Sequence, residues 1–447
     1  MGADAEKGSY RTPAGRKTWE FIIFGVCSVL SVGIGCVVGW NSPSIVKLLS
    51  DDSPIKVTPP DVSTLVATMT VGHMVAPPLN TFLADQIGRK YTMLLASSPL
   101  VVSWGLIIIA TSVWELYIAR FMAGLSLGLF VCIGPMYIGE MSSPQYRGIA
   151  GSLTSFAYNM GILATFIVAP YLSISLMAGI YLAVTVGFIV LFWFMPESPY
   201  FLAMRNRTEE AEEVLEKLRG KNDVSEEMAT IVNSLVSKGK TVTKSGSLRD
   251  VLCVPGNFRA FAIIALFSVT HHFGGFFTIL TYGQLIFKAT NSSTSDYTVN
   301  VLLGVMQLVS SLITACLVER VGRRPLILNS GIVAALCNLV IGFFFLAKDY
   351  LNMDVSNFSW APFAASMVMV FAFNCGLMCL QIIMMSEIFA TEVKAISTCL
   401  VGIVSGCIAT LGSKLYIWIA ITMNYGHCPP FLAFGVILFI LTLTIYT

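Results

Sequence analysis

Apolar stretches of about twenty residues recur along this chain and alternate with short polar segments. A helix needs about 20 mostly apolar residues to cross the hydrocarbon core of a bilayer, so each stretch predicts one membrane-spanning helix. The predicted spans cover residues 21–40, 62–84, 91–110, 114–138, 148–170 and 174–195, and then 258–286, 297–318, 325–347, 360–385, 396–421 and 428–446. The pattern therefore predicts about twelve spans, which excludes a seven-helix receptor.

Two short charged strings indicate that the second half of the chain repeats the first. They are DQIGRK, from Asp85 to Lys90, and ERVGRR, from Glu319 to Arg324, and they lie 319 − 85 = 234 residues apart in a chain of 447. Each string follows the second apolar stretch of its half and precedes the third. A Gly among charged residues suits a tight loop between helix ends. We therefore predict an all-α membrane protein made of two six-helix bundles related by pseudo-symmetry.

The chain divides into four predicted parts. Residues 1–20 form a tail, 21–196 a first bundle, 197–257 a polar linker and 258–447 a second bundle. In the linker, Thr208 is expected to cap a helix that ends at Gly220, and Ser225 to open a second helix that ends near Gly239. The alternative interpretation is a solvated linker with some helix.

Composition agrees with a membrane protein. Hydrophobic residues make up 55% of the chain and charged residues 12%, and the mean hydropathy is +0.77, whereas a soluble domain carries about 25% charged residues. The sequence has no phosphate-binding loop of the Walker type. Its Cys and His residues lack the spacing of a known metal site. We therefore expect no enzyme activity, no catalytic residue, no cofactor, no metal and no nucleic-acid partner.

Lys and Arg predict the side of the membrane that each loop faces. The N-terminal tail is basic, and so are the alternate loops that carry Arg89, Arg147 and Arg320. Because basic loops face the cytoplasm, we expect a multi-pass protein of the plasma membrane with a cytoplasmic N-terminus. The sequons at Asn291 and Asn357 then fall in outer loops, where N-glycosylation is possible.

Several further strings resemble those of the sugar porters of the major facilitator superfamily. They are RFMAGLSLG from Arg120, PMYIGEMSSPQYRG from Pro135 and PESPYFL from Pro196. WNSP from Trp40 and SVWELYIARF from Ser112 most resemble the facilitated trehalose transporters of insects. The resemblance covers nearly the whole chain. It implies the major facilitator fold, a small-molecule sugar as substrate, a lipid bilayer as surroundings and no obligate protein partner.

Charged residues at the expected cytoplasmic helix ends form two matching sets. The first half carries Asp85, Gly88, Arg89, Glu140 and Arg147, and the second carries Glu319, Gly322, Arg323, Glu387 and Lys394. Acids and bases that pair when the inner side is sealed, and separate when it opens, would provide the two states that alternating access needs. The alternative is that these charges only mark helix ends at the lipid headgroups.

The predicted spans carry acidic residues only at their margins. No Asp or Glu occurs between Glu20 and Asp51, and Val37 and Val38 stand about where proton-coupled members of the resembled family carry Asp. An ion-coupled carrier usually keeps an ionisable carboxylate within the membrane. Facilitated diffusion, or uniport, is therefore the favoured mechanism.

Six polar residues within the spans are candidates for binding the substrate. They are Ser155, His271, His272, Gln307, Asn374 and Gln381. Where the resembled family usually has QQxSGIN, this chain reads HHFGGFF, so histidines replace amides and Phe277 replaces Asn. Imidazole can still donate and accept hydrogen bonds, whereas phenyl cannot. Gln307 and Asn374 are equally well explained as residues that join helices by hydrogen bonds.

Small residues predict how individual spans pack and bend. Gly124 and Gly128 lie on one helical face, which favours close contact with another helix. Gly274 and Gly275 are expected to break the seventh span. The tenth span lacks the Pro residues usual in the resembled family, which predicts a straighter helix there.

The predicted function is facilitative transport of a sugar, either trehalose or a hexose, by alternating access. The altered polar residues leave two alternatives, a transport-deficient sugar sensor and a carrier of another small polar solute. The sequence ends at Thr447, before the PETxG string usual in the resembled family. Either the protein lacks this element, which would favour the sensor, or the sequence is part of a longer chain.

Overall fold

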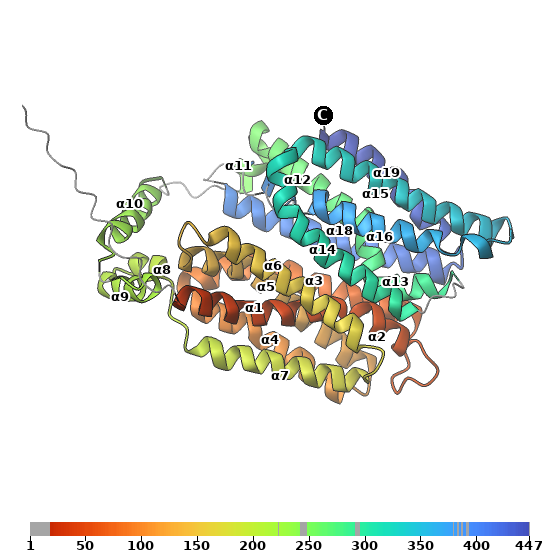
Figure 1. Ribbon diagram of the computed structural model, residues 1–447, viewed down its shortest axis with the longest axis horizontal. Coiled ribbons are helices and arrows are strands. Elements are labelled where there is room, and N and C mark those ends of the chain that lie inside the picture. The colour runs from red at the N-terminus through yellow and green to blue at the C-terminus, as the bar shows by residue number, and fades with distance from the viewer. Residues whose placement is uncertain are drawn as a thin grey trace, which may run out of the picture.

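A computed structural model describes residues 18–221, 223–241, 248–290, 296–378, 380–381, 384–385, 388–389 and 393–446. Within these ranges, 12 helices are long and apolar enough to cross a membrane. The predicted number of spans is therefore confirmed, and the chain is nearly all helical (Figure 1).

The first six spans form one bundle. They are α1 (Thr18–Gly39) with α2 (Asn41–Leu48), α3 (Pro59–Gln86), α4 (Arg89–Ile109), α5 (Val113–Met141), α6 (Arg147–Val168) and α7 (Ile174–Trp193). Helix α5 packs against α3 and α4, and α1 packs against α6 and α7. The first span extends past its predicted end at residue 40, because α2 continues it as far as Leu48.

The last six spans form a second bundle. They are α12 (Pro255–Phe273) with α13 (Phe276–Lys288), α14 (Asp296–Val321), α15 (Arg323–Phe345) with the π-helix η1 (Leu346–Tyr350), the 3-10 helix η2 (Ser356–Phe358) with α16 (Ala361–Phe373) and the π-helix η3 (Asn374–Met378), α18 (Lys394–Ile417) with the π-helix η4 (Trp418–Thr422), and α19 (Cys428–Tyr446). Helix α15 packs against α16 and α19, and α12 packs against α18 and α19.

The two bundles meet where α3 packs against α18, α6 against α14 and α2 against α13. The α3 and α18 helices run antiparallel along their contact. The Thr70 and Thr410 hydroxyl oxygens lie 2.7 Å apart, and further along the same contact the Thr81 hydroxyl lies 3.8 Å from the Cys399 sulfur. In Figure 1 the ribbons of the bundles converge towards α2 and α13 and diverge towards the opposite end.

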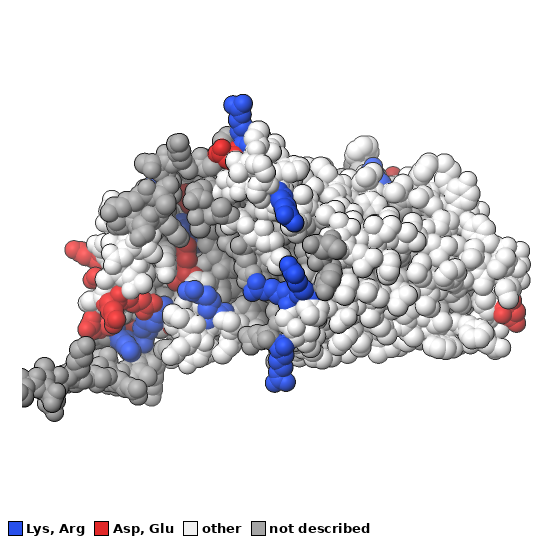
Figure 2. All heavy atoms as spheres, turned by 90° about the horizontal axis from the view of Figure 1, so that it is seen from above, with Lys and Arg blue, Asp and Glu red and all other residues white. Residues whose placement is uncertain are grey.

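The polar linker forms short helices at that opposite end of the molecule (Figure 1). They are α8 (Pro199–Met204), α9 (Thr208–Arg219), α10 (Ser225–Thr241) and α11 (Leu248–Cys253). The buried residues Leu202, Leu215 and Met228 belong to a small apolar core shared by α8, α9 and α10. Figure 2 shows most charged side chains of one face gathered at this end, while the face towards the other end is almost uncharged.

The start of α9 differs from the prediction. Thr208 is the first helical residue, and Arg207 occupies the N-cap position without a side-chain capping bond. The Arg207 guanidinium instead pairs with the Glu210 carboxylate one turn into the helix. The predicted end of the helix is confirmed, because Gly220 has the left-handed conformation with a φ of 61°.

The two charged strings adopt the same backbone conformation in both halves. Gly88 has a φ of 95° and a ψ of 171°, and Gly322 has a φ of 82° and a ψ of 166°. Each Gly immediately precedes a helix, α4 or α15, that begins with Arg. Positive φ angles favour Gly, so the repeated string encodes the same turn twice.

The tenth span is not a regular α-helix throughout, although it lacks the Pro residues of the resembled family. After Phe373, the α16 helix passes into the π-helical turn η3, from Asn374 to Met378. The Asn374 side-chain amide donates hydrogen bonds to the Gln307 carbonyl, at 3.1 Å, and to the Ser310 hydroxyl, at 2.7 Å, both on α14. A π-turn interrupts a helix without Pro, and these bonds hold it against the neighbouring span.

The close contact expected at Gly124 and Gly128 is confirmed. A Cβ atom at Gly124 would lie 1.9 Å from the Met69 carbonyl oxygen of α3. A Cβ atom at Gly128 would lie 2.5 Å from the Ala76 Cβ on the same helix. Only Gly therefore lets α5 approach α3 this closely.

We expect Gly124→Ala to lower the free energy of unfolding by about 1–3 kcal/mol, the usual cost of an overpacked interior. Gly139→Ala on the same helix is the matched control, because nothing lies within 4 Å of a Cβ atom at that position. Thermal unfolding of the purified proteins in detergent measures both. Equal melting temperatures for the two variants would contradict the close contact.

Candidate functional site

Arg89 is the centre of a charge cluster at the end of the first bundle where the linker lies. Its guanidinium Nε lies 3.1 Å from Glu140 Oε2, and its Nη1 lies 3.8 Å from Asp85 Oδ1. Its Nη1 also donates to the Ala84 carbonyl at 3.1 Å. Glu140 accepts a further hydrogen bond from the Ser198 hydroxyl. The predicted residues Asp85, Arg89 and Glu140 are thus brought together, all within one bundle.

Glu197, which follows the sixth span, is hydrogen-bonded to the turn at Gly88. Its carboxylate accepts hydrogen bonds from the backbone N–H groups of Arg89 and Lys90, each at 3.0 Å. A Cβ atom at Gly88 would lie 2.4 Å from Glu197 Oε2. Burial raises the pKa of Glu197. The carboxylate therefore caps α4 and requires Gly at position 88.

The structure describes only some of the other expected gate residues. Arg147 is exposed at the start of α6, and Arg323 is exposed at the start of α15. The side chains of Glu319 and Lys394, and the whole of Glu387, lie outside the described residues. Pairing between the two sets of charges therefore stays a prediction.

The predicted break in the seventh span is confirmed. Helix α12 ends at Phe273 and α13 begins at Phe276. Gly275 has a φ of 79°, and a Cβ atom there would lie 2.2 Å from Asn338 Oδ1 of α15. The Asn338 amide donates to the Gly274 carbonyl at 2.9 Å, so it satisfies a backbone group that the break exposes.

The two histidines before this break have different neighbours. The Nε2 atom of His272 lies 3.2 Å from the Ser405 hydroxyl of α18. Its Nδ1 atom is buried and has no hydrogen-bond partner among the described residues. The His271 ring lies among aromatic rings, 5.9 Å from Phe276 and 6.0 Å from Phe373 between centroids. Of the two histidines, His272 therefore makes the polar contact with another span, and the His271 ring packs among aromatic rings.

The remaining candidates make other contacts. Asn374 uses its amide to join η3 to α14, as described above, which agrees with its alternative role between helices. Gln307 is buried, and its Oε1 atom has no partner within the described ranges. The Gln381 amide lies 3.3 Å from the Ser268 hydroxyl of α12. Ser155 is exposed on α6.

A fully buried arginine, Arg120 of α5, lies beside the first span. Its Nη2 atom donates to Asn41 Oδ1 at 2.6 Å and to the Val37 carbonyl at 3.3 Å. The guanidinium also lies 4.8 Å from the Trp40 ring centroid, within cation–π range. Its Nε and Nη1 atoms have no partner among the described residues. Arg120 therefore anchors the point where α1 passes into α2.

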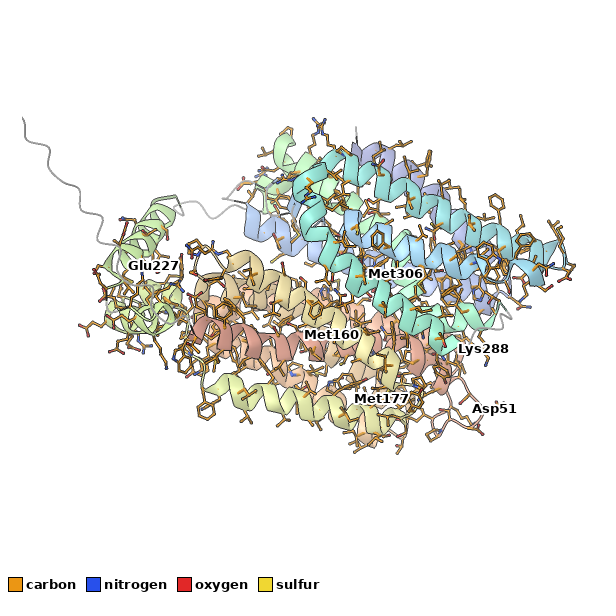
Figure 3. All side chains as sticks on the ribbon, viewed as in Figure 1. Asp51, Met160, Met177, Glu227, Lys288 and Met306 are labelled. Atoms are coloured by element: carbon orange, nitrogen blue, oxygen red, sulfur yellow. The ribbon has the colours of Figure 1, made fainter. Side chains whose placement is uncertain are left out.

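A buried hydrogen-bond cluster joins the two bundles next to this anchor. The Ser42 hydroxyl of α2 accepts from the Gln284 backbone N–H at 3.1 Å and from the Asn300 amide at 3.2 Å. All three residues are at most 2% exposed. Figure 3 labels Asp51 and Lys288 at this end of the molecule and Glu227 at the opposite end. This outer cluster therefore closes one end of the contact between bundles.

Comparison with known proteins agrees with these features. Residues 48–447 match the model of the family described as sugar (and other) transporters. The chain belongs to this family. It is a multi-pass membrane protein and not an enzyme, and the resemblance inferred from its strings is confirmed.

Curated relatives in the sugar transporter family include insect proteins. The facilitated trehalose transporter Tret1 of Drosophila willistoni is 27% identical over 376 residues, which cover 83% of this chain and 43% of that protein. The Tret1 protein of Culex quinquefasciatus is 28% identical over 393 residues, which cover 86% of this chain and 75% of that protein. This chain therefore spans less than half the length of the Drosophila willistoni relative.

Solved structures of similar fold include the xylose transporter XylE from E. coli. The inward-open form has a TM-score of 0.78 at 17% identity and covers 96% of each chain. The partially occluded inward-open form has a TM-score of 0.76 at 18% identity and covers 96% of this chain and 99% of that chain. This likeness confirms the predicted major facilitator fold.

Four features of this sugar transporter family member were not among the predicted site residues. They are Glu197, Arg120, Asn338 and the Ser42–Gln284–Asn300 cluster. Glu197 and Arg120 belong to the strings PESPYFL and RFMAGLSLG, which already pointed to those positions. Asn300 and Asn338 are polar residues within apolar spans, a signal for a role inside the membrane.

Of the two predicted glycosylation sites, Asn357 is exposed in η2, and Asn291 lies outside the described residues.

Proposed function

We propose that this chain is a facilitative carrier of a sugar, trehalose or a hexose, and that it works by alternating access. The observation that carries the proposal is the break in the seventh span beside His272. The break exposes backbone groups, and the buried Nδ1 atom of His272 has no partner among the described residues. Such groups suit hydrogen bonds to a hydroxylated solute.

The contacts between and within the bundles support two states. The Arg89 cluster lies within the first bundle, whereas the outer cluster of Ser42, Gln284 and Asn300 joins the two bundles. A rocking motion that opens the outer end must break the outer cluster while the Arg89 cluster moves as a unit. The charges of the second bundle, including Arg323, are proposed to meet the Arg89 cluster when the inner end closes.

Uniport is supported by the surroundings of Arg120. Its described neighbours are an amide, a backbone carbonyl, a thioether and an indole ring. A carboxylate that could carry a proton is not among them. We also propose a plasma-membrane location with the N-terminus and the α8–α11 end in the cytoplasm, which places Asn357 outside.

Uptake of radiolabelled trehalose, glucose and other small solutes into oocytes that express the chain tests this proposal. We expect saturable uptake of at least one sugar without a net current. An inward current on addition of the sugar would contradict uniport. Absence of uptake for every sugar, with the protein present at the cell surface, would contradict the carrier.

Near the break, this chain has His271, His272 and Phe277 where the resembled family has amide side chains. We propose that this difference makes the sugar site weak. We expect the triple variant His271→Gln, His272→Gln, Phe277→Asn to lower the half-saturating sugar concentration by roughly two- to tenfold. Each neutral hydrogen bond contributes about 0.5–1.5 kcal/mol, and 1.4 kcal/mol corresponds to about a tenfold change in affinity.

The single variant Phe277→Leu is the control, because it removes the aromatic ring without adding a donor or an acceptor. We expect its half-saturating concentration to stay close to that of the original protein. An unchanged value in the triple variant would contradict the role of these positions. Uptake by the triple variant alone would instead favour the sugar sensor or a carrier of another polar solute.

A further inference from the structure

The α18 helix has one face that points away from the protein. The exposed residues of α18 on this face are Cys407, Leu411, Lys414 and Leu415, and Trp418 of η4 continues the stripe. On other faces, Ser405 contacts His272, and Ser413 contacts Tyr282 at 2.8 Å. The exposed stripe is apolar except for Lys414 and faces the hydrocarbon of the membrane.

A groove of about 330 Å³ lies beside this stripe, between the two bundles. Pro60 and Ser63 of α3 line one wall, and Leu411, Lys414, Trp418 and Thr422 are among the residues of the other. Ser63 donates its hydroxyl hydrogen to the Pro60 carbonyl at 2.8 Å.

The Lys414 ammonium lies in a mostly apolar groove, where a positive charge needs a negatively charged partner. Within the described ranges it makes no ion pair and no hydrogen bond. It precedes the end of η4 by 422 − 414 = 8 residues, or about 12 Å along a helix. Its long side chain can carry the ammonium along the groove towards that end of the helix, where lipid headgroups lie.

We propose that this groove binds an anionic phospholipid. The phosphate lies against the Lys414 ammonium, and one acyl chain lies along Leu411 and Trp418. An acyl chain fits the apolar lining, and a phosphate supplies the opposite charge that the protein lacks here. Among the described residues, the groove lining contains no Asp or Glu, so the ammonium of a zwitterionic headgroup has no carboxylate partner there. This disfavours phosphatidylcholine.

The proposed lipid contacts both bundles, since one wall of the groove belongs to α3 and the other to α18 and η4. Movement of one bundle against the other changes the width of the groove. A bound lipid therefore stabilises the transport state in which the groove matches its shape. This inference concerns the membrane-facing side and does not rest on the proposed sugar substrate.

Trp418 provides a direct probe, because bromine atoms on an acyl chain quench a nearby indole. The purified protein is titrated in detergent with brominated phosphatidylglycerol or brominated phosphatidylcholine. The Trp418 signal is obtained by subtracting the signal of Trp418→Phe. We expect half-maximal quenching at an at least fivefold lower mole fraction of phosphatidylglycerol than of phosphatidylcholine.

Substitutions assign the preference to the Lys414 charge. We expect Lys414→Leu to remove the difference between the lipids and Lys414→Arg to keep it. Lys56→Leu is the matched control, because Lys56 is exposed in an outer loop and donates to the Asp51 carbonyl; it should keep the difference. Helical circular dichroism and monodisperse elution verify that each variant is folded.

Equal quenching by the two lipids in the original protein would overturn the proposal, and so would a preference that survives in Lys414→Leu. Free glycerol phosphate separates the lipid from a soluble anion. If it relieves the quenching at millimolar concentration, the site binds a soluble anion and the proposed lipid is wrong. If it has no effect while phosphatidylglycerol quenches, the acyl chain is required as proposed.

Discussion

Replacing Arg89 by Ala is expected to lower sugar uptake about tenfold or more while the amount of protein at the cell surface stays nearly unchanged. The Arg89 guanidinium joins Glu140, Asp85 and the Ala84 carbonyl. Hydrogen bonds to charged groups contribute about 1.5–3 kcal/mol. Because the charges of the second bundle are proposed to meet this cluster only when the inner end closes, loss of the cluster destabilises that state and shifts the equilibrium between the two states by about tenfold or more.

Glu140→Ala should have an effect of the same size, because it removes the other half of the pair. Arg89→Lys keeps the charge but loses the planar donor pair, so we expect an intermediate effect. The double variant of Arg89→Ala and Glu140→Ala should be no worse than either single variant, since both act on one interaction. Uptake equal to that of the original protein in both single variants would contradict the gate.

Arg219→Met is expected to lower the free energy of unfolding by about 3–5 kcal/mol, the cost of breaking a buried ion pair. Arg219 of α9 pairs with Glu20 at the start of α1 and with Glu227 of α10. Its Nη1 atom also donates to the Met141 carbonyl at 3.0 Å. Glu20 is 0% exposed, so its carboxylate loses its buried cation in this variant. Thermal unfolding in detergent measures the loss.

The linker supplies a matched control for this experiment. Arg207 pairs with Glu210, and both side chains are about half exposed, at 54% and 50%. Exposed pairs contribute about 0–1 kcal/mol, so Arg207→Met should change stability little. Adding Glu20→Gln to Arg219→Met should restore part of the loss, because it removes the buried charge. Similar losses in Arg219→Met and Arg207→Met would contradict a buried link between the linker and the first span.

The prediction from sequence was most accurate where the membrane and the backbone act locally. The twelve spans follow from apolar length. The turns at Gly88 and Gly322 follow from a residue that tolerates positive φ. The break at Gly274 and Gly275 follows in the same way. These features depend on short stretches of the chain, so their signal lies in the residues themselves.

The prediction was incomplete where distant residues decide the structure. The tenth span contains a π-turn although it lacks Pro, because Asn374 bonds to α14. Asn338 of α15 supports the break in the seventh span from 64 positions away. Such contacts cannot be predicted from the spacing of residues along the chain.

The sequence by itself therefore determined the number of spans, the duplication into two bundles, the turns at Gly88 and Gly322 within each bundle, and the family to which the chain belongs. The tertiary structure alone decided which polar groups meet. It placed Arg219 against Glu20, Ser42 against Gln284, and Lys414 in a groove whose described lining has no acidic residue. The physical reason is that hydrophobic length and backbone preference act within one helix, whereas the burial and pairing of a charge depend on which helices pack around it.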